Sequence, residues 1–338
     1  MVTIKDVARQ ANVSVATVSR VFSGANVVRE ETSKRIRDVA ARLRYAPHGG
    51  ARSLITSRTH TLGVLLPDLY GEFFSEVIRG IDLTARQHGY HILVSRSNEG
   101  RTEIEEAMRA MRGRVDGVLL MSPDVDADSL RNVPSNVPVV LLCSATRGSD
   151  TDTVTIQNCR GARQMVSHLI SLGHQRIAIV KGAVGNYDAA ERLRGYRAAL
   201  RDAGIASDRA LERDGDFTEA GGYAAARDLL ALNPPPTAIF AANDSMAIGA
   251  LSALKESGIR VPQDMAIAGF DDIPLARYMD PPLSSVRVPI SSLGARAVEI
   301  LLHGIAHKNS HEPRRERIAT ELVIRRSCGA PSAERPPP

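Results

Sequence analysis

Residues 3–24 read TIKDVARQANVSVATVSRVFSG, and this stretch decides how the N-terminal part of the chain folds. Thr3 can cap a helix in which Asp6 lies near the positive end of the helix dipole. The apolar helical spacing breaks at Asn12, and Ser14 offers the N-cap of a second helix. The pattern predicts two short helices joined by a tight turn. Such a pair is typical of a DNA-reading helix-turn-helix and also of a generic helical hairpin.

Positive charge is concentrated in the first 60 residues. They hold 11 Lys and Arg against 4 Asp and Glu, a net of +7, whereas residues 61–338 carry a net of −2. A third helix is predicted over about Glu30 to Arg44, with an apolar stripe that includes Ile36 and Val39. Clustered positive charge favours a nucleic-acid partner, because phosphate contacts release counterions; a solvated basic surface is the alternative.

From residue 61 onward, short apolar runs alternate with helical patterns. Strands that alternate with helices predict doubly wound parallel sheets, which bind ligands at the carboxyl ends of their strands. The tail of residues 329–338 ends in three prolines and is expected to be disordered. The predicted strands are Leu62–Leu66, Tyr90–Ser95, Gly117–Met121, Val137–Leu142, Ile177–Lys181, Thr237–Ala241, Met265–Gly269 and Ala319–Ile324, and the first predicted helices among them are Phe73–His88 and Glu103–Arg112.

The composition disfavours several classes of protein. The chain has 338 residues and is 43% hydrophobic, enough for a large core in two or three domains. It has no apolar run of about 18 residues and no secretory segment, so a cytoplasmic location is expected. Cys143, Cys159 and Cys328 form no CxxC pair, and the phosphate-binding, nucleophile and zinc motifs GxxxxGK[ST], GxGxxG, GxSxG and HExxH are missing. We therefore expect no catalytic residues, no metal and no cofactor.

Three further motifs follow the opening stretch: VREET at 28–32, RYAP at 44–47 and ARSL at 51–54. In this order and spacing they resemble the DNA-binding headpiece of the LacI/GalR family of bacterial transcription repressors, and the resemblance continues to about Cys328. It implies an α/β protein: a three-helix helix-turn-helix headpiece, a hinge helix, and a two-lobed, periplasmic-binding-protein-like core of doubly wound parallel sheets. The implied bounds are 1–46 for the headpiece, 47–60 for the hinge and 61–328 for the core, with lobes of about 61–157 plus 287–317 and about 158–286 plus 318–328.

The resemblance also implies which residues contact DNA. The second helix would lie in the major groove, where Arg20 can bond guanine while Val15 and Ala16 make only apolar contacts with bases. Leu54 matches a side chain that wedges between base pairs in the minor groove. Other members of the set match positions that hold phosphates. The implied DNA-binding residues are Ser14, Val15, Ala16, Thr17, Arg20, Tyr45, Ala51 and Leu54.

A second set of positions matches the family's effector site. Arg192, in GNYDAAERLRGY at 185–196, matches an arginine that grips effector hydroxyls or carboxylates. Cys143 departs from the pattern, because several relatives carry aspartate there; Asp188 is the candidate replacement for the lost acceptor. A fork of donors, acids, an amide and apolar walls suit a sugar-like or purine-like ligand. The implied effector-binding residues are Phe73, Phe74, Asp188, Arg192, Phe217, Asn243 and Asp271.

The implied function is ligand-controlled repression by a homodimer bound to an inverted-repeat DNA operator. A sugar inducer and control of carbohydrate-utilisation genes are favoured, with a purine-like corepressor as the alternative. The tail lacks a leucine heptad, which predicts a dimer and not a tetramer. A transport-type binding protein would need a signal peptide and no basic headpiece, and an enzyme would need a catalytic motif. The sequence does not identify the effector, the operator or the regulated genes.

Overall fold

A computed structural model describes residues 2–22, 27–45, 58–96, 101–122, 137–144, 151–307 and 310–329 of the chain. The chain divides into two compact units, the first formed by residues 1–61 and 111–116 and the second by the remainder. Most of the predicted hinge helix and of the predicted disordered tail lies outside the described residues. Among the described helices, none has the length and hydropathy of a membrane-spanning segment.

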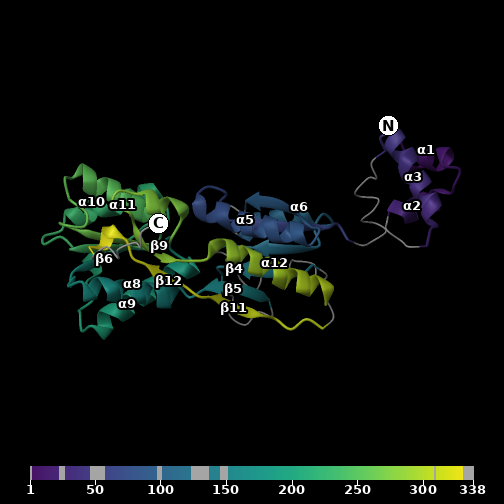
Figure 1. The fold of residues 1–338 in the computed structure, drawn as a ribbon. Coiled ribbons are helices and arrows are strands. Elements are labelled where there is room, and N and C mark those ends of the chain that lie inside the picture. The colour runs from purple at the N-terminus through teal and green to yellow at the C-terminus, as the bar shows by residue number, and fades with distance from the viewer. Residues whose placement is uncertain are drawn as a thin grey trace, which may run out of the picture. The chain divides into compact units, whose positions relative to one another are not determined.

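Three helices form the first unit: α1 (Ile4–Gln10), α2 (Val15–Phe22) and α3 (Glu30–Arg42) (Figure 1). The predicted caps are present. The Thr3 backbone N–H donates to the Asp6 carboxylate at 2.9 Å, and the Ser14 hydroxyl oxygen accepts from the Thr17 backbone N–H at 3.1 Å. These caps satisfy polar groups that the first turn of a helix leaves without partners. One small core holds the unit together, formed by Val7, Ala8, Ala11, Val18, Val21, Ile36, Val39 and Ala40.

The first lobe of the second unit is built on a six-stranded sheet with the strand order β11-β5-β4-β3-β1-β2. The β1/β3, β3/β4, β4/β5 and β5/β11 pairs are parallel, as the alternation of strands and helices predicts. The strands are β1 (Thr61–Leu66), β2 (His91–Arg96), β3 (Gly117–Leu120), β4 (Val139–Leu142), β5 (Asp152–Ile156) and β11 (Arg315–Ile318), and the helices are α5 (Glu72–Gln87), α6 (Arg101–Met111) and α12 (Ile290–Ala306).

The second lobe repeats this plan with the strand order β12-β10-β9-β8-β6-β7, in which only the pairing of β10 with β12 is antiparallel among the described pairs. Helices α8 and α9 pack together on one face of the sheet, and α10 and α11 on the other (Figure 1). The strands are β6 (Ile177–Val180), β7 (Glu212–Arg213), β8 (Ala238–Ala241), β9 (Ala266–Asp271), β10 (Ser284–Arg287) and β12 (Glu321–Val323), and the helices are α8 (Asn158–Ser171), α9 (Tyr187–Asp202), α10 (Glu219–Leu230) and α11 (Asp244–Glu256), with short 3-10 turns η1 (Arg209–Leu211), η2 (Pro274–Tyr278) and η3 (Arg326–Cys328).

The described chain crosses between the two sheets at three places: after β5 at Gln157, after β10 at Val288, and between β11 and β12 at Ala319 and Thr320. Because parallel strands end on the same edge of a sheet, the loops after β1, β3 and β4 in the first lobe and after β6, β8 and β9 in the second gather at the carboxyl ends of the strands.

One predicted strand is shorter than expected. The prediction spans Ala319–Ile324, but residues 319 and 320 form a crossing, and the strand β12 covers only Glu321–Val323. The chain also forms β5, β7, β10 and β11, which the apolar pattern does not predict. The strand that precedes the crossing, β11, belongs to the sheet of the first lobe, so the crossing separates two strands of different sheets.

Candidate functional site

The face of α2 that carries the expected base-reading residues is exposed. Val15 has 40% of its surface accessible, and Ala16 and Arg20 are exposed as well, while Val18 and Val21 on the opposite face are buried in the core of the unit. Two exposed apolar side chains at the start of a capped helix leave an edge that can contact a thymine methyl group. The helix therefore offers both an apolar edge and an arginine on one accessible face.

The residues expected to hold phosphates lie at the ends of this unit. The hydroxyls of Ser14 and Thr17 are 2.8 Å apart, and the ring of Tyr45 packs edge-on against Phe22 with centroids 5.9 Å apart. The first turn of α2 contains no acidic residue, so its positive dipole end is available to an anion. Ala51 and Leu54 lie outside the described residues.

In the second unit, Arg192 lies at the centre of a buried polar group on α9. Only 3% of the arginine is exposed. Its Nε donates to the Asn158 side-chain oxygen at 2.8 Å, and its Nη1 donates to the backbone oxygen of Ala242, just beyond β8. Its Nη2 lies 3.1 Å from Asp271 Oδ1 at the end of β9. A buried guanidinium is therefore held by three segments that are distant in sequence.

Asp271 retains unused acceptor capacity. Its Oδ1 is within ion-pair distance of Arg192 but has no well-aligned hydrogen bond in the described structure, and the residue is only 5% exposed. Burial raises the pKa of Asp271 to about 6, although the nearby Arg192 charge opposes that rise. A hydroxyl donor from a ligand would supply the hydrogen bond that this carboxylate lacks.

Asp188 joins the same group through two hydrogen bonds. The Asn158 side-chain nitrogen donates to its Oδ1 at 2.7 Å, and the Cys143 thiol also hydrogen-bonds to the carboxylate. Burial raises the pKa of Asp188 to about 6, with Arg192 opposing the rise, and burial also raises the pKa of the Cys143 thiol well above its ordinary value. The thiol is therefore a neutral donor. It follows β4 in the first lobe, whereas Asp188 belongs to the second.

We call Cys143, Asn158, Asp188, Arg192, Phe217 and Asp271 the effector cluster. Its apolar wall is aromatic: the Arg192 guanidinium carbon lies 3.9 Å from the ring centroid of Phe270 and 5.9 Å from that of Phe217. The Phe217 ring covers Gly182 so closely that a Cβ added there would lie 2.1 Å from the ring. Only glycine at position 182 leaves room for the Phe217 ring, so the position of the ring depends on this glycine.

Several residues in or next to the effector cluster have a strained backbone conformation. Cys143, Phe217, Asp271 and Asp272 all have positive φ angles, of 53°, 70°, 105° and 53°. Positive φ is costly for residues other than glycine, and it persists where the surrounding structure imposes it, often at ligand sites.

The structure gives Asn243 two contacts within the protein. Its side-chain oxygen accepts from the Met246 N–H at 2.9 Å as the N-cap of α11, and its side-chain nitrogen donates to the backbone oxygen of Phe217 at 2.9 Å. Asn243 therefore caps α11 and positions the aromatic wall, and the ligand contact expected of it stays a prediction.

Phe73 and Phe74 lie at the start of α5, half-buried against the core, with ring centroids 5.6 Å apart. Within the described residues, no hydrogen bond, ion pair or ring contact joins them to the effector cluster. The same turn carries Glu72, whose carboxylate accepts from the Leu275 N–H at 2.8 Å. This bond links the first lobe to the turn after β9 in the second.

Sequence reasoning missed Asn158, Phe270 and Glu72. Asn158 is 1% exposed and contacts Asp188 and Arg192, which lie 30 and 34 positions further along the chain. The one feature near Asn158 in the chain that could have indicated its role is its position directly after the crossing at Gln157. Among the described residues, no group of His, Cys, Asp and Glu side chains is arranged to hold a metal ion. The arrangement suits the recognition of a polar molecule by hydrogen bonds.

Family models match both parts of the chain. A model of bacterial regulatory proteins of the lacI family matches residues 3–48, and a model of the periplasmic binding protein-like domain matches residues 166–328.

Whole-length relatives agree with this division. The chain is 36% identical to the ribose operon repressor of Escherichia coli (strain K12) over 318 residues, which cover 93% of this chain and 96% of that protein. It is 36% identical to the HTH-type transcriptional repressor PurR of Photobacterium profundum over 330 residues, or 97% of this chain and 98% of that protein. A crystal structure of the lac repressor dimer bound to operator and an anti-inducer superposes with a TM-score of 0.88 at 30% identity, covering 97% of this chain and 99% of that one. The chain therefore belongs to the lacI family of bacterial regulatory proteins.

Proposed function

We propose that this protein is a cytoplasmic transcriptional repressor without enzymatic activity that binds an inverted-repeat operator as a homodimer and releases it when a sugar binds the effector cluster. Residues 1–46 would be the DNA-binding headpiece, residues 47–60 the hinge and residues 61–328 the sensing core. The observation that carries the proposal is the buried contact among Arg192, Asp271 and Asp188, at the carboxyl ends of strands and beside Cys143 of the other lobe.

A sugar is the favoured effector because the cluster combines a charged donor, two acceptors and an aromatic wall. Arg192 can donate to ring or hydroxyl oxygens, and Asp271 can accept from a hydroxyl. The Phe217 ring can stack on the apolar face of a pyranose or furanose. The name of the ribose operon repressor supports the same ligand class.

A purine-like corepressor is the second candidate. The aromatic rings near Arg192 would stack a heterocyclic base as readily as a sugar face, and the similarity to PurR extends over 97% of this chain. The two candidates predict opposite signs of regulation: a sugar would release the operator, and a purine would increase its occupancy.

A reporter gene under an operator selected for binding to this protein tests both candidates. Wild type and Arg192→Ala would each be assayed with and without D-ribose or guanine, with exposed Arg201 on the same helix replaced by alanine as a matched control. If a sugar induces, Arg192→Ala should repress without release; if a purine corepresses, the variant should be derepressed. An Arg192→Ala protein that responds to ligand as wild type does would contradict the proposed site.

A further inference from the structure

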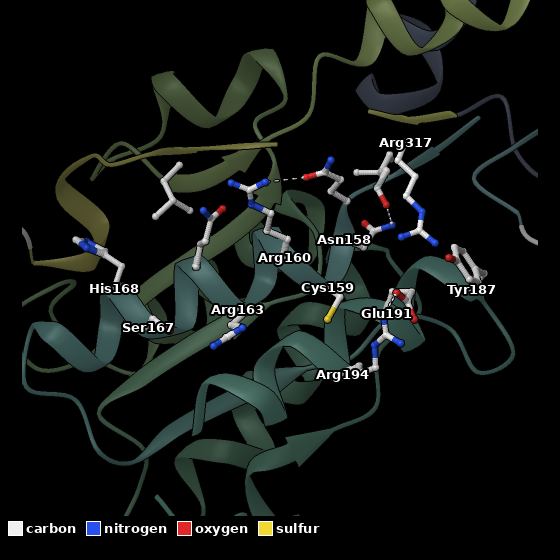
Figure 2. Close-up of a pocket in the computed structure, with 14 residues that line it drawn as sticks. Asn158, Cys159, Arg160, Arg163, Ser167, His168, Tyr187, Glu191, Arg194 and Arg317 are labelled. Atoms are coloured by element: carbon white, nitrogen blue, oxygen red, sulfur yellow. Dashed lines mark hydrogen bonds and ion pairs between the residues drawn. The ribbon is translucent and has the colours of Figure 1, made fainter. Parts of the chain in front are cut away.

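A second cavity lies outside the effector cluster, where the chain crosses between the lobes. It has a volume of about 810 Å³, within the range of small-molecule sites, and we call it the crossing pocket (Figure 2). Its walls come from both lobes: Ile156 on β5 and Arg317 on β11 belong to the first sheet, Gln157 is a crossing residue, and the other lining residues belong to α8, α9 and β12 of the second lobe. A molecule bound here would contact both lobes beside Gln157, one of the crossing residues.

The crossing pocket is strongly basic. Its lining includes Arg160, Arg163, Arg194 and Arg317 against a single carboxylate, Glu191. Two of the arginines are already paired: Arg163 Nε is 2.8 Å from Asp202, and Arg194 Nη2 is 2.5 Å from Glu191. The remaining positive charge therefore resides on the other two arginines.

Arg160 and Arg317 lack carboxylate partners within the described part of the chain. Arg160 reaches only the side-chain oxygen of Gln157, at 3.5 Å. Both lie close to the N-terminus of α8, a 14-residue helix with no acidic residue in its first turn, so the helix dipole adds to their charge. In Figure 2, Arg160 points out from α8 and Arg317 comes down from its strand on the far side of Asn158. Two guanidinium groups beside a helix N-terminus suit a phosphoryl group.

The rest of the lining suits an organic molecule larger than free phosphate. Tyr187 and Leu322 supply apolar surface, and Gln164 and Ser167 on α8 supply hydrogen-bonding groups. Burial raises the pKa of the Tyr187 hydroxyl, and Arg317 is near enough to oppose that rise, which places this arginine beside the ring. The pocket therefore combines an anion-binding end with polar and apolar walls.

The crossing pocket touches the effector cluster through one residue. Asn158 lines the pocket, and its side chain joins Arg192 to Asp188. Arg192, Asp271 and Phe217 do not line the pocket. The two sites are therefore adjacent but have separate binding groups.

We propose that the crossing pocket binds a phosphorylated metabolite such as a sugar phosphate, which contacts Arg160 of the second lobe and Arg317 of the first. A ligand that bridges the lobes binds best to one lobe arrangement, and it therefore shifts the equilibrium between arrangements. The binding claim stands independently; its effect on operator occupancy rests on the proposed function.

The direct test is calorimetric titration of the full-length protein, without DNA, with ribose 5-phosphate, D-ribose and inorganic phosphate in separate experiments. Ribose 5-phosphate should bind, inorganic phosphate should compete with it weakly, and Arg160→Ala or Arg317→Ala should each weaken its binding by about 10-fold or more, because each removes a charge-assisted hydrogen bond. The corresponding lysine variants should recover part of the affinity, and Arg201→Ala should leave it unchanged.

Three outcomes would overturn the proposal. These are no binding of ribose 5-phosphate at 10 mM, unchanged binding by the double alanine variant, and loss of ribose 5-phosphate binding in Arg192→Ala but not in that double variant. A gel-shift series with the same ligands separates the two claims. If D-ribose has no effect on operator binding while the phosphate ester binds through the two arginines, D-ribose is excluded as the inducer and the crossing pocket stands.

Discussion

Replacing Ile36 by alanine should destabilise the first unit and weaken operator binding while leaving the second unit intact. Ile36 is fully buried on α3, in a core that comprises eight buried apolar residues in the described part of the unit. Deleting a buried isoleucine side chain down to alanine costs about 2–5 kcal/mol, through lost burial and the cavity left behind. Ile36 is not itself among the residues expected to contact DNA.

The size of the unit makes this loss decisive. At about 0.05–0.15 kcal/mol per residue, the predicted headpiece of residues 1–46, which carries the three helices of the unit, has a free energy of unfolding of only about 2–7 kcal/mol. A loss of 2–5 kcal/mol therefore brings folded and unfolded states of the unit close to balance at 37 °C. The core of the second unit shares no residue with this small cluster, so its stability should not change.

Scanning calorimetry of the full chain, together with a gel shift on a selected operator, measures both effects. Ile36→Ala should remove or lower the transition of the first unit, weaken operator binding by about twofold or more, and leave effector affinity unchanged. Asp38→Ala, an exposed change on the same helix, is the matched control and should leave the melt unchanged. An unchanged transition of the first unit, or a lowered melting temperature of the second unit, would refute the reasoning.

Four further predictions follow from the charge, the hinge motif, the tail and the buried carboxylates. The logarithm of operator affinity should fall steeply with the logarithm of salt concentration, because a unit with a net charge of +7 binds phosphates; a flat dependence in gel shifts would contradict this. Leu54→Ala should weaken operator binding and reduce DNA bending while effector affinity in calorimetry stays the same, and equal loss of both would make Leu54 a core residue. Light scattering should give about twice the 36.4 kDa chain mass, and a stable mass of four chains would exclude a dimer. The pKa of Asp188 and of Asp271 is raised from 3.8 to about 6, so the folded state binds more protons than the unfolded state between these pH values. The contribution of the two carboxyl groups to the free energy of unfolding should therefore rise as pH falls from 7 to 5. Urea titrations should show a smaller rise for Asp188→Asn than for wild type, and an identical rise would rule out Asp188 as a source of this pH dependence.

Strands with an apolar sequence could be predicted, and strands with a polar sequence could not. Buried apolar runs such as Leu62–Leu66 stand out in the sequence, and the predicted strands overlap β1, β2, β3, β4, β6, β8, β9 and β12. In contrast, β10 reads Ser-Ser-Val-Arg, yet Ser284 and Ser285 are fully buried. The Ser284 hydroxyl donates to the backbone oxygen of Arg325, and the Ser285 hydroxyl donates to Asp244. Hydrogen bonds that form only in the folded chain pair these polar groups, and no local pattern announces them.

The candidate site was predictable only through the family's motifs. The structure brings Arg192, Asp188, Asp271 and Phe217 together, as the resemblance implies, but spacing alone could not have placed four residues from three separate segments in contact. For Asn243, physical chemistry predicts a second role beside the one transferred from the motif. An asparagine before a helix is an N-cap on physical grounds, and here capping and the hydrogen bond to Phe217 use both ends of its amide.

If the effector cluster binds a ligand as proposed, its buried charges would let that ligand control operator binding. Moving an equilibrium from 1:99 to 99:1 requires about 5.5 kcal/mol of differential binding. A hydrogen bond to a charged group contributes about 1.5–3 kcal/mol, so two or three such bonds suffice if only one lobe arrangement presents their partners. Cys143 lies in the first lobe and donates to Asp188 of the second, so the relative placement of the lobes sets what Asp188 can still accept. A ligand that replaces the thiol as the hydrogen-bond donor to Asp188 would therefore have an affinity that depends on the lobe arrangement.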